Sequence, residues 1–139
     1  MTTSIASRTS AGSARTLVIE DFPAAVAAGW LVVDIRSTAQ RERQGVLTGA
    51  TAVEARQAIE LLDPRSPIRL RSVATAEGVV LVSDDGFEAE LFAWEIRARG
   101  ANGVRALGGG FEALRRAGGV KLLAGALHVR RERSAIAAH

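Results

Sequence analysis

Short apolar runs alternate along the chain with longer segments of helical periodicity. Such runs are typical of strands covered on both faces, and the longer segments are typical of amphipathic helices. The runs predict strands at residues 17–19, 31–36, near 51, 79–83 and 103–107. The segments between them predict helices starting near residue 21, at 37–44, up to 63, at 87–99 and at 111–118.

Proline, glycine and aspartate mark several predicted helix ends. Asp21 can cap the first helix, and Pro23 is tolerated in its first turn. Gly29 should end this helix, while the third helix should stop before Pro64 because proline disfavours a helical residue ahead of it. These signals give boundaries to the first and third predicted helices.

The predicted helix at residues 87–99 has a mixed pattern and ends at Gly100. Its apolar side is expected to carry Leu91, Trp94, Ile96 and Ala98. We expect Trp94, and likewise Trp30 outside this helix, to lie in the core.

Strands that alternate with helices indicate the α/β class, with a parallel sheet, helices on both faces and right-handed crossovers. We expect a disordered tail at residues 1–16, because this stretch is rich in serine, threonine and alanine. One domain should span residues 17–119. A basic tail of helix-forming composition follows at residues 120–139.

The 139 residues suit one domain, and the absence of cysteine excludes disulfides, thiolate metal ligands and a cysteine nucleophile. No apolar run is long enough to cross a membrane, and the first residues lack the apolar centre of a secretion signal. We therefore predict a cytoplasmic protein without membrane contact.

The net charge of +3 is concentrated in the two tails, which together carry +5 and leave the central segment at −2. Tyrosine is absent, and no aromatic residues interleave with the basic ones, so a stacking surface for single strands is missing. The cluster of Arg130, Arg131 and Arg133 fits a solvated tail. Nucleic acid is not predicted as a partner.

The stretch VVLVSDDGFEAE, residues 79–90, leads from a buried strand through a glycine-containing loop into a helix. A loop of this kind often builds an anion site, yet this one carries Asp84, Asp85 and Glu88. The three carboxylates offer ligands for a divalent cation, but their spacing fits no calcium loop. The favoured interpretation is a capping box, in which Asp85 caps the helix and Glu88 reaches back. The loop would then be a closed helix cap.

Several motifs in one order resemble the rhodanese-like family over residues 17–119. The closing segment GANGVRALGGGFEALRRAG is the strongest match, through Gly100, Val104, Leu107, Gly109, Gly110 and Phe111. Asp34 and Arg36 at a strand end, followed by GVLTGA, support it. More weakly, GATAVEARQAIELLDPRSPIR is similar to the middle of small bacterial rhodaneses associated with cysteine breakdown.

The resemblance implies a five-stranded, mostly parallel sheet with helices on both faces. It also implies a loop after the fourth strand that opens with a cysteine, which carries sulfane sulfur as a persulfide within a ring of backbone amides. Here Ser83 takes that position. The rest of the active-site-like loop comprises Asp84, Asp85, Gly86, Phe87, Glu88 and Ala89. The pair of Asp34 and Arg36 is expected either to brace this loop or to form an ordinary salt bridge.

Serine cannot form a persulfide, and as a nucleophile it needs an adjacent base. The only histidines, His128 and His139, belong to the tail. The sequence thus predicts an inactive binding or regulatory module without metal or cofactor, whose partner is a protein or a small sulfur-containing ligand. The alternatives are a sulfurtransferase whose cysteine at position 83 was replaced by serine, and a phosphatase of the same architecture, which also needs the cysteine. The run Gly108–Gly110 predicts a turn more than a nucleotide-binding loop.

Overall fold

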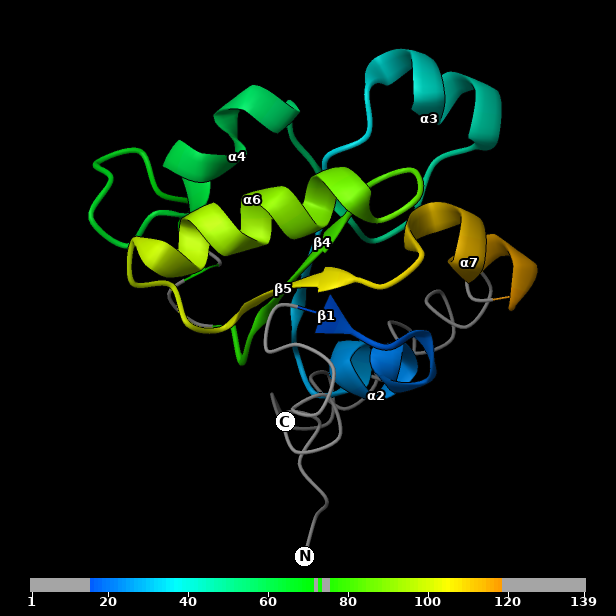
Figure 1. The fold of residues 1–139 in the computed structure, drawn as a ribbon, viewed down its shortest axis with the longest axis horizontal. Helices are drawn as coiled ribbons and strands as arrows, with labels where there is room; N and C mark the ends of the chain where they lie inside the picture. Colours follow the sequence, from blue (N-terminus) through cyan, green and yellow to red (C-terminus); the bar gives the residue numbers. More distant parts are fainter. Residues whose placement is uncertain (1–15, 72, 74–75, 119–139) are drawn as a thin grey trace, which may run out of the picture.

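The computed structural model describes residues 16–71, 73 and 76–118. Its centre is a parallel sheet of five strands in the order β1-β5-β4-β2-β3 (Figure 1). The strands are β1 (Thr16–Leu17), β2 (Leu31–Asp34), β3 (Thr51–Ala52), β4 (Val79–Val82) and β5 (Val104–Leu107). All strand pairs are parallel, as the alternation of strands and helices predicts.

Helices cover both faces of the sheet (Figure 1). A short 3-10 turn, η1 (Ile19–Asp21), leads into the first of them. The α-helices are α2 (Phe22–Ala27), α3 (Thr38–Gln44), α4 (Ala55–Leu62), α6 (Phe87–Ala98) and α7 (Gly110–Arg116). Helices α2 and α7 pack on one face and α4 and α6 on the other, which gives the layered α/β arrangement.

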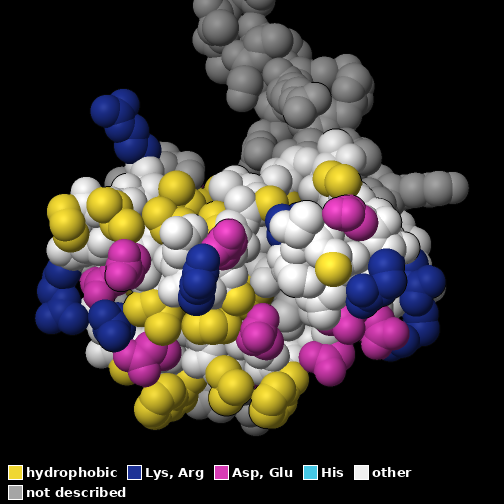
Figure 2. Space-filling view, turned by 90° about the horizontal axis from the view of Figure 1, so that it is seen from above, with side chains coloured by type: hydrophobic (Ala, Val, Ile, Leu, Met, Phe, Trp, Pro, Cys, Tyr) yellow, Lys and Arg dark blue, Asp and Glu magenta, His cyan; other side chains and the backbone are white. Residues whose placement is uncertain are grey.

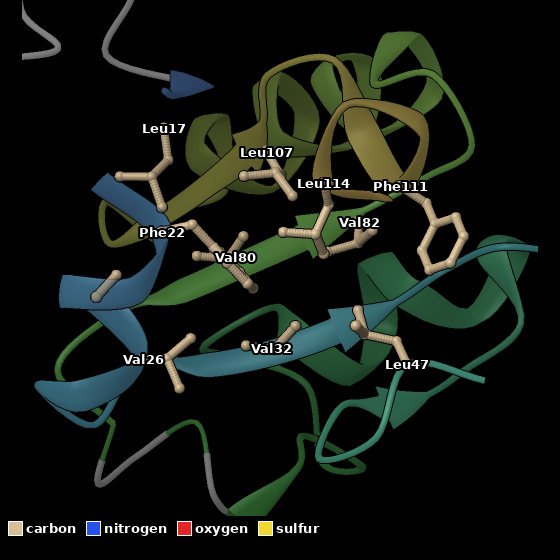
Figure 3. Packing of buried hydrophobic residues seen from close by; sticks show 11 residues of the cluster. Leu17, Phe22, Val26, Val32, Leu47, Val80, Val82, Leu107, Phe111 and Leu114 are labelled. Carbon is tan, nitrogen blue, oxygen red and sulfur yellow. The ribbon is translucent and has the colours of Figure 1, made fainter. Parts of the chain in front are cut away.

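The central strand β4 supplies side chains to two hydrophobic clusters, one on each face of the sheet. Val80 and Val82 belong to the cluster under α2 and α7, which Figure 3 shows together with Phe22 and Leu114. Val79 and its neighbour Leu81 belong to the cluster under α4 and α6. All four residues of β4 are buried, which is why this strand is an unbroken apolar run.

The predicted helix ends agree with the structure, but Asp21, although it lies at the N-terminal boundary of α2, makes no capping hydrogen bond with its side chain. Pro23 lies in the first turn of α2, and Gly29 follows its end with a φ of 97°, a left-handed conformation that favours glycine. Helix α4 ends at Leu62, before Pro64. Helix α3 begins with a capping box between Ser37 and Gln40. The predicted strand at residues 17–19 is shorter, because Ile19 already begins η1.

The predicted apolar side of α6 is right for Ile96, which is buried, and wrong for Leu91, Trp94 and Ala98, which are exposed. Leu91 is 56% exposed and Trp94 57% exposed, so Trp94 is not a core residue. Trp30 is partly buried against the cluster under α2. The buried residues of α6 are Ala89, Ala93 and Ile96. Two alanines on the inner face let the helix lie close to the sheet, and the large side chains of Phe87, Leu91 and Trp94 are left on the outer face.

The expected tail at residues 1–16 lies outside the described residues except for Thr16, which pairs with Ala106 in the sheet. The expected C-terminal tail, residues 120–139, also lies outside them. In the described part of the chain, no helix is long and apolar enough to cross a membrane.

Candidate functional site

The loop between β4 and α6 surrounds the side chain of Ser83 with backbone amides. The Ser83 hydroxyl oxygen accepts hydrogen bonds from the amide of Gly86 at 3.1 Å and from the amide of Ala89 at 3.2 Å. Ser83 is only 3% exposed, so the serine oxygen satisfies two buried donors. Amides at the start of α6 therefore converge on the side chain of residue 83.

The predicted capping box of Asp85 and Glu88 is wrong. The residue at the N-terminal boundary of α6 is Gly86, which has a φ of 93° and no side chain to cap the helix. Asp85 accepts one hydrogen bond, from the amide of Phe87 at 3.0 Å. The third amide of the helix, which a capping side chain ordinarily binds, donates to Ser83. Ser83 and Asp85 thus share the capping role.

The backbone of the same loop caps the start of α7. The amide of Phe111 donates to the carbonyl of Ser83 at 2.8 Å, and the amide of Glu112 donates to the carbonyl of Asp84 at 3.0 Å. A Cβ at Gly110 would lie 2.4 Å from the Ser83 carbonyl oxygen, so the close approach requires glycine. Gly109 and Gly110 therefore form a tight turn that lets the start of α7 pack against the loop after β4, the same loop that leads into α6.

Asp34 and Arg36 form a buried ion pair at the carboxyl end of β2. Their side chains are 2.9 Å apart at the closest atoms, and the residues are 2% and 1% exposed. The Arg36 guanidinium also lies over the ring of Phe111, 3.8 Å from the ring centroid. This stacking attaches the ion pair to the first turn of α7.

Gln44 links this ion pair to the loop. Its side-chain oxygen accepts a hydrogen bond from Arg36 at 3.1 Å, and its side-chain nitrogen donates to the carboxylate of Asp84. Arg36 additionally donates to the carbonyl of Gly45 at 3.0 Å. The pair of Asp34 and Arg36 braces the loop through this glutamine, in addition to forming a salt bridge.

Sequence reasoning did not identify Gln44. Its only signal was its position at the end of the predicted polar helix at residues 37–44, and several other residues of that segment are equally polar. The role depends on the fold, which brings the end of α3 to the loop after β4.

The three acids of the loop diverge. Asp84 is bound by Gln44, Asp85 by the amide of Phe87, and Glu88 lines a neighbouring cavity. Among residues 16–71, 73 and 76–118, no group of three acidic, histidine or cysteine side chains is placed to hold a metal ion. The structure therefore does not bring these acids together as a cation site.

A cavity of about 500 Å³ opens beside the loop, near the starts of α3, α4 and α6. Its lining carries charges of both signs, from Arg41 and Arg56 and from Glu54 and Glu88. The other lining residues are Ile35, Arg36, Ser37, Thr38, Gln40 and Ala55. Ser83 is not among them, so the buried hydroxyl is not presented to a ligand in this cavity.

Within the described part of the chain, the hydroxyl of Ser83 has no base as a hydrogen-bond partner. Both of its hydrogen-bond partners are N–H donors, and neither can accept the hydroxyl proton. His128 and His139 lie outside the described residues. The arrangement supports an acceptor role for the serine oxygen.

No protein-family model matches the chain, and no curated protein matches it by sequence. Several solved structures do match the chain. A protein of unknown function from Rhodopseudomonas palustris, described as a possible tyrosine phosphatase, has a TM-score of 0.68 and 27% sequence identity, over 86% of this chain and 94% of that one.

Two further structures share the fold. A rhodanese homolog from Thermus thermophilus has a TM-score of 0.51 and 24% identity, over 70% of this chain and 98% of that one. The reduced CoADR-RHD protein of Bacillus anthracis has a TM-score of 0.53 and 17% identity, over 83% of this chain but only 17% of that one. The fold of this chain is rhodanese-like, a five-stranded parallel sheet with helices on both faces.

Proposed function

We propose that this chain is a catalytically silent rhodanese-like module that acts by binding. The observation that carries the proposal is the buried hydroxyl of Ser83, which occupies the amide cradle itself. The position that resembles the sulfur-carrying cysteine is thus filled by a hydrogen-bond acceptor.

The chemistry of sulfur transfer supports the proposal. A persulfide requires a thiolate, and a serine oxygen cannot replace it, because no sulfur–sulfur bond can form on oxygen. The chain contains no cysteine that could take over the role. A phosphatase of this architecture would need the same thiolate, so the comparison with a possible tyrosine phosphatase adds no activity to this chain.

One observation favours a second candidate function, sulfur transfer. The amides of Gly86 and Ala89 converge on residue 83, where a thiolate would gain from them. A sulfurtransferase in which serine has replaced cysteine at position 83 would have this geometry. The natural gene decides this alternative, since a cysteine codon at position 83 would support the enzyme.

The braced loop and the cavity beside it are the surface that we assign to binding. The cavity carries Arg56, whose side chain is 84% exposed, together with Glu88 at the start of α6. Charges of both signs at a concave surface suit a polar segment of a protein partner. The buried ion pair of Asp34 and Arg36 is part of this surface, because Arg36 lines the cavity.

Affinity capture from the native cell tests the binding role. The full chain and its Arg56→Glu variant are immobilised, with Arg116→Glu on the exposed end of α7 as the matched control. We expect the same protein to be retained by the wild-type chain and by Arg116→Glu, and to be lost from Arg56→Glu. Retention that is equal on all three would contradict binding at this cavity.

A further inference from the structure

Three large apolar side chains form an exposed stripe along α6. Phe87, Leu91 and Trp94 are 67%, 56% and 57% exposed, and their spacing of four and three residues places them on one face of the helix. Ala98, one turn further, is also exposed. In the space-filling view, hydrophobic side chains project from the rim of the molecule beside acidic ones (Figure 2). A run of this kind is typical of a contact with another helix.

The charges beside the stripe are distributed unequally along α6. Asp84, Asp85, Glu88 and Glu90 lie at its N-terminal end; residues 84–90 include no basic residue, and Arg41 and Arg56 line the cavity beside Glu88. The C-terminal end carries Arg97 and Arg99 with Glu95, and Arg99 forms ion pairs with Glu95 and with Asp63, which Arg65 also contacts. The helix is therefore acidic at one end and net basic at the other.

We propose that a second copy of this chain docks on this stripe, with the two α6 helices antiparallel about a two-fold axis. In this orientation the acidic end of each helix faces the basic end of the other. A parallel pair would instead place Glu88 beside Glu88 and Arg99 beside Arg99, which is unfavourable. One surface supplies both halves of such an interface, as two-fold symmetry requires.

The apolar residues fit the same arrangement. The two-fold axis would pass near the middle of the stripe. Leu91 of one copy would then lie opposite Leu91 and Trp94 of the other, and Phe87 would lie toward the C-terminal end of the facing helix. Because α6 has 12 residues, the contact is about 18 Å long, and such a short contact predicts a weak dimer. Phe87 directly follows the Ser83 loop, so the second copy would lie beside that loop. The proposal does not depend on whether Ser83 is silent.

Sedimentation equilibrium of the full chain over a range of concentrations tests the dimer. We expect the wild-type mass to rise toward that of two copies, and Leu91→Glu to stay monomeric with an unchanged melting temperature. Val46→Glu is the control, since Val46 is 71% exposed and lies in the loop after α3, not on α6. A monomeric wild-type chain at all concentrations would overturn the proposal, as would a dimer that Leu91→Glu does not disrupt.

Two other results would also contradict a second copy as the occupant. A monomeric wild-type chain whose melting temperature falls in Leu91→Glu would show that the chain's own residues cover the stripe. Masses beyond two copies would show an open assembly without a two-fold axis.

Orientation is tested separately, because the chain has no cysteine of its own. Leu91→Cys should give a disulfide-linked dimer under mild oxidation, and Val46→Cys should not. Glu88→Arg should weaken the dimer at low salt, and adding Arg99→Glu should restore it; the melting temperature of each variant is measured as well, because Arg99 also pairs with Asp63 and Glu95 within the chain. A double variant weaker than both single variants would exclude the antiparallel arrangement.

Discussion

The hydroxyl oxygen of Ser83 lies 3.2 Å from the amide nitrogen of Ala89 and accepts a hydrogen bond from it. This bond crosses the start of α6, because Ser83 precedes the helix and Ala89 lies in its first turn. Ser83 is therefore a structural part of the loop, and several consequences can be measured.

Replacing Ser83 by alanine should lower the free energy of unfolding by about 1–3 kcal/mol, because two buried amides lose their acceptor. Urea denaturation measures this change. Ser66→Ala is the matched control, since Ser66 accepts one exposed amide, that of Ile68, and its loss should cost less. An equal effect of both substitutions would contradict the acceptor role of Ser83.

Asp85→Ala should cost only about 0.5–1 kcal/mol, because the exposed Asp85 caps one amide, that of Phe87. Ser83→Ala should therefore lower the free energy of unfolding more than Asp85→Ala does. The reverse ranking in the same denaturation experiment would restore Asp85 as the main cap of α6.

Arg36→Ala should destabilise the chain by about 3–5 kcal/mol, because it leaves the carboxylate of Asp34 buried without its partner. Asp34→Ala together with Arg36→Ala should cost much less than the two single substitutions added together. A double-mutant cycle measures this coupling. Additive effects would show that the two side chains act independently.

The stability of the chain should fall in acid partly through Asp63. The amide of Arg65, which donates to Asp63 at 2.9 Å, lowers the pKa of this carboxyl, and Arg99 acts in the same direction. Since the folded pKa lies below the unfolded value of about 3.9, this contribution is present above that pH and is lost as the pH falls through the folded pKa. Asp63→Asn should reduce the dependence of unfolding free energy on pH below about pH 4. An unchanged dependence would contradict the assignment.

Ser83→Cys alone should not restore efficient sulfur transfer. The amides of Gly86 and Ala89 would favour a thiolate, but burial at position 83 and the carboxylates of Asp84, Asp85 and Glu88 would raise the thiol pKa. The same acids would repel thiosulfate, which is a dianion. Alkylation at several pH values measures the thiol pKa, and thiocyanate formation measures turnover.

Removing the acids should change this outcome. Asp84→Asn, Asp85→Ala and Glu88→Arg, added to Ser83→Cys, should raise turnover well above that of the single variant, provided that circular dichroism shows a folded chain. A low thiol pKa and high turnover in Ser83→Cys alone would contradict the repulsion and favour the sulfurtransferase alternative.

The fold could be predicted from the sequence because its strands are short, apolar and regularly spaced. Strand β4 can be recognised from the sequence because it is buried on both faces and is therefore an unbroken apolar run. The glycines after β5 can be recognised as a turn, where the backbone of another segment comes close. The outer face of α6 could not be predicted in this way. Its composition is apolar on more than one side, and only the packing of Ala89 and Ala93 against the sheet shows which side is inside.

The candidate site was predicted in part. The position of the loop and the bracing pair of Asp34 and Arg36 follow from short motifs. The bonds within the loop do not, because Ser83, Asp85 and Glu88 can all cap a helix, and the choice depends on where the backbone turns at Gly86. Gln44 depends on contacts between residues 40 positions apart, for which the sequence carries no local signal.

The most direct test of the central claim is thiosulfate:cyanide sulfurtransferase activity of the purified full chain, with Ser83→Ala as the control. The account predicts no thiocyanate above background for either protein, because serine at position 83 cannot hold sulfur and the chain has no cysteine. Thiocyanate formed by the wild-type chain and abolished by Ser83→Ala would contradict it.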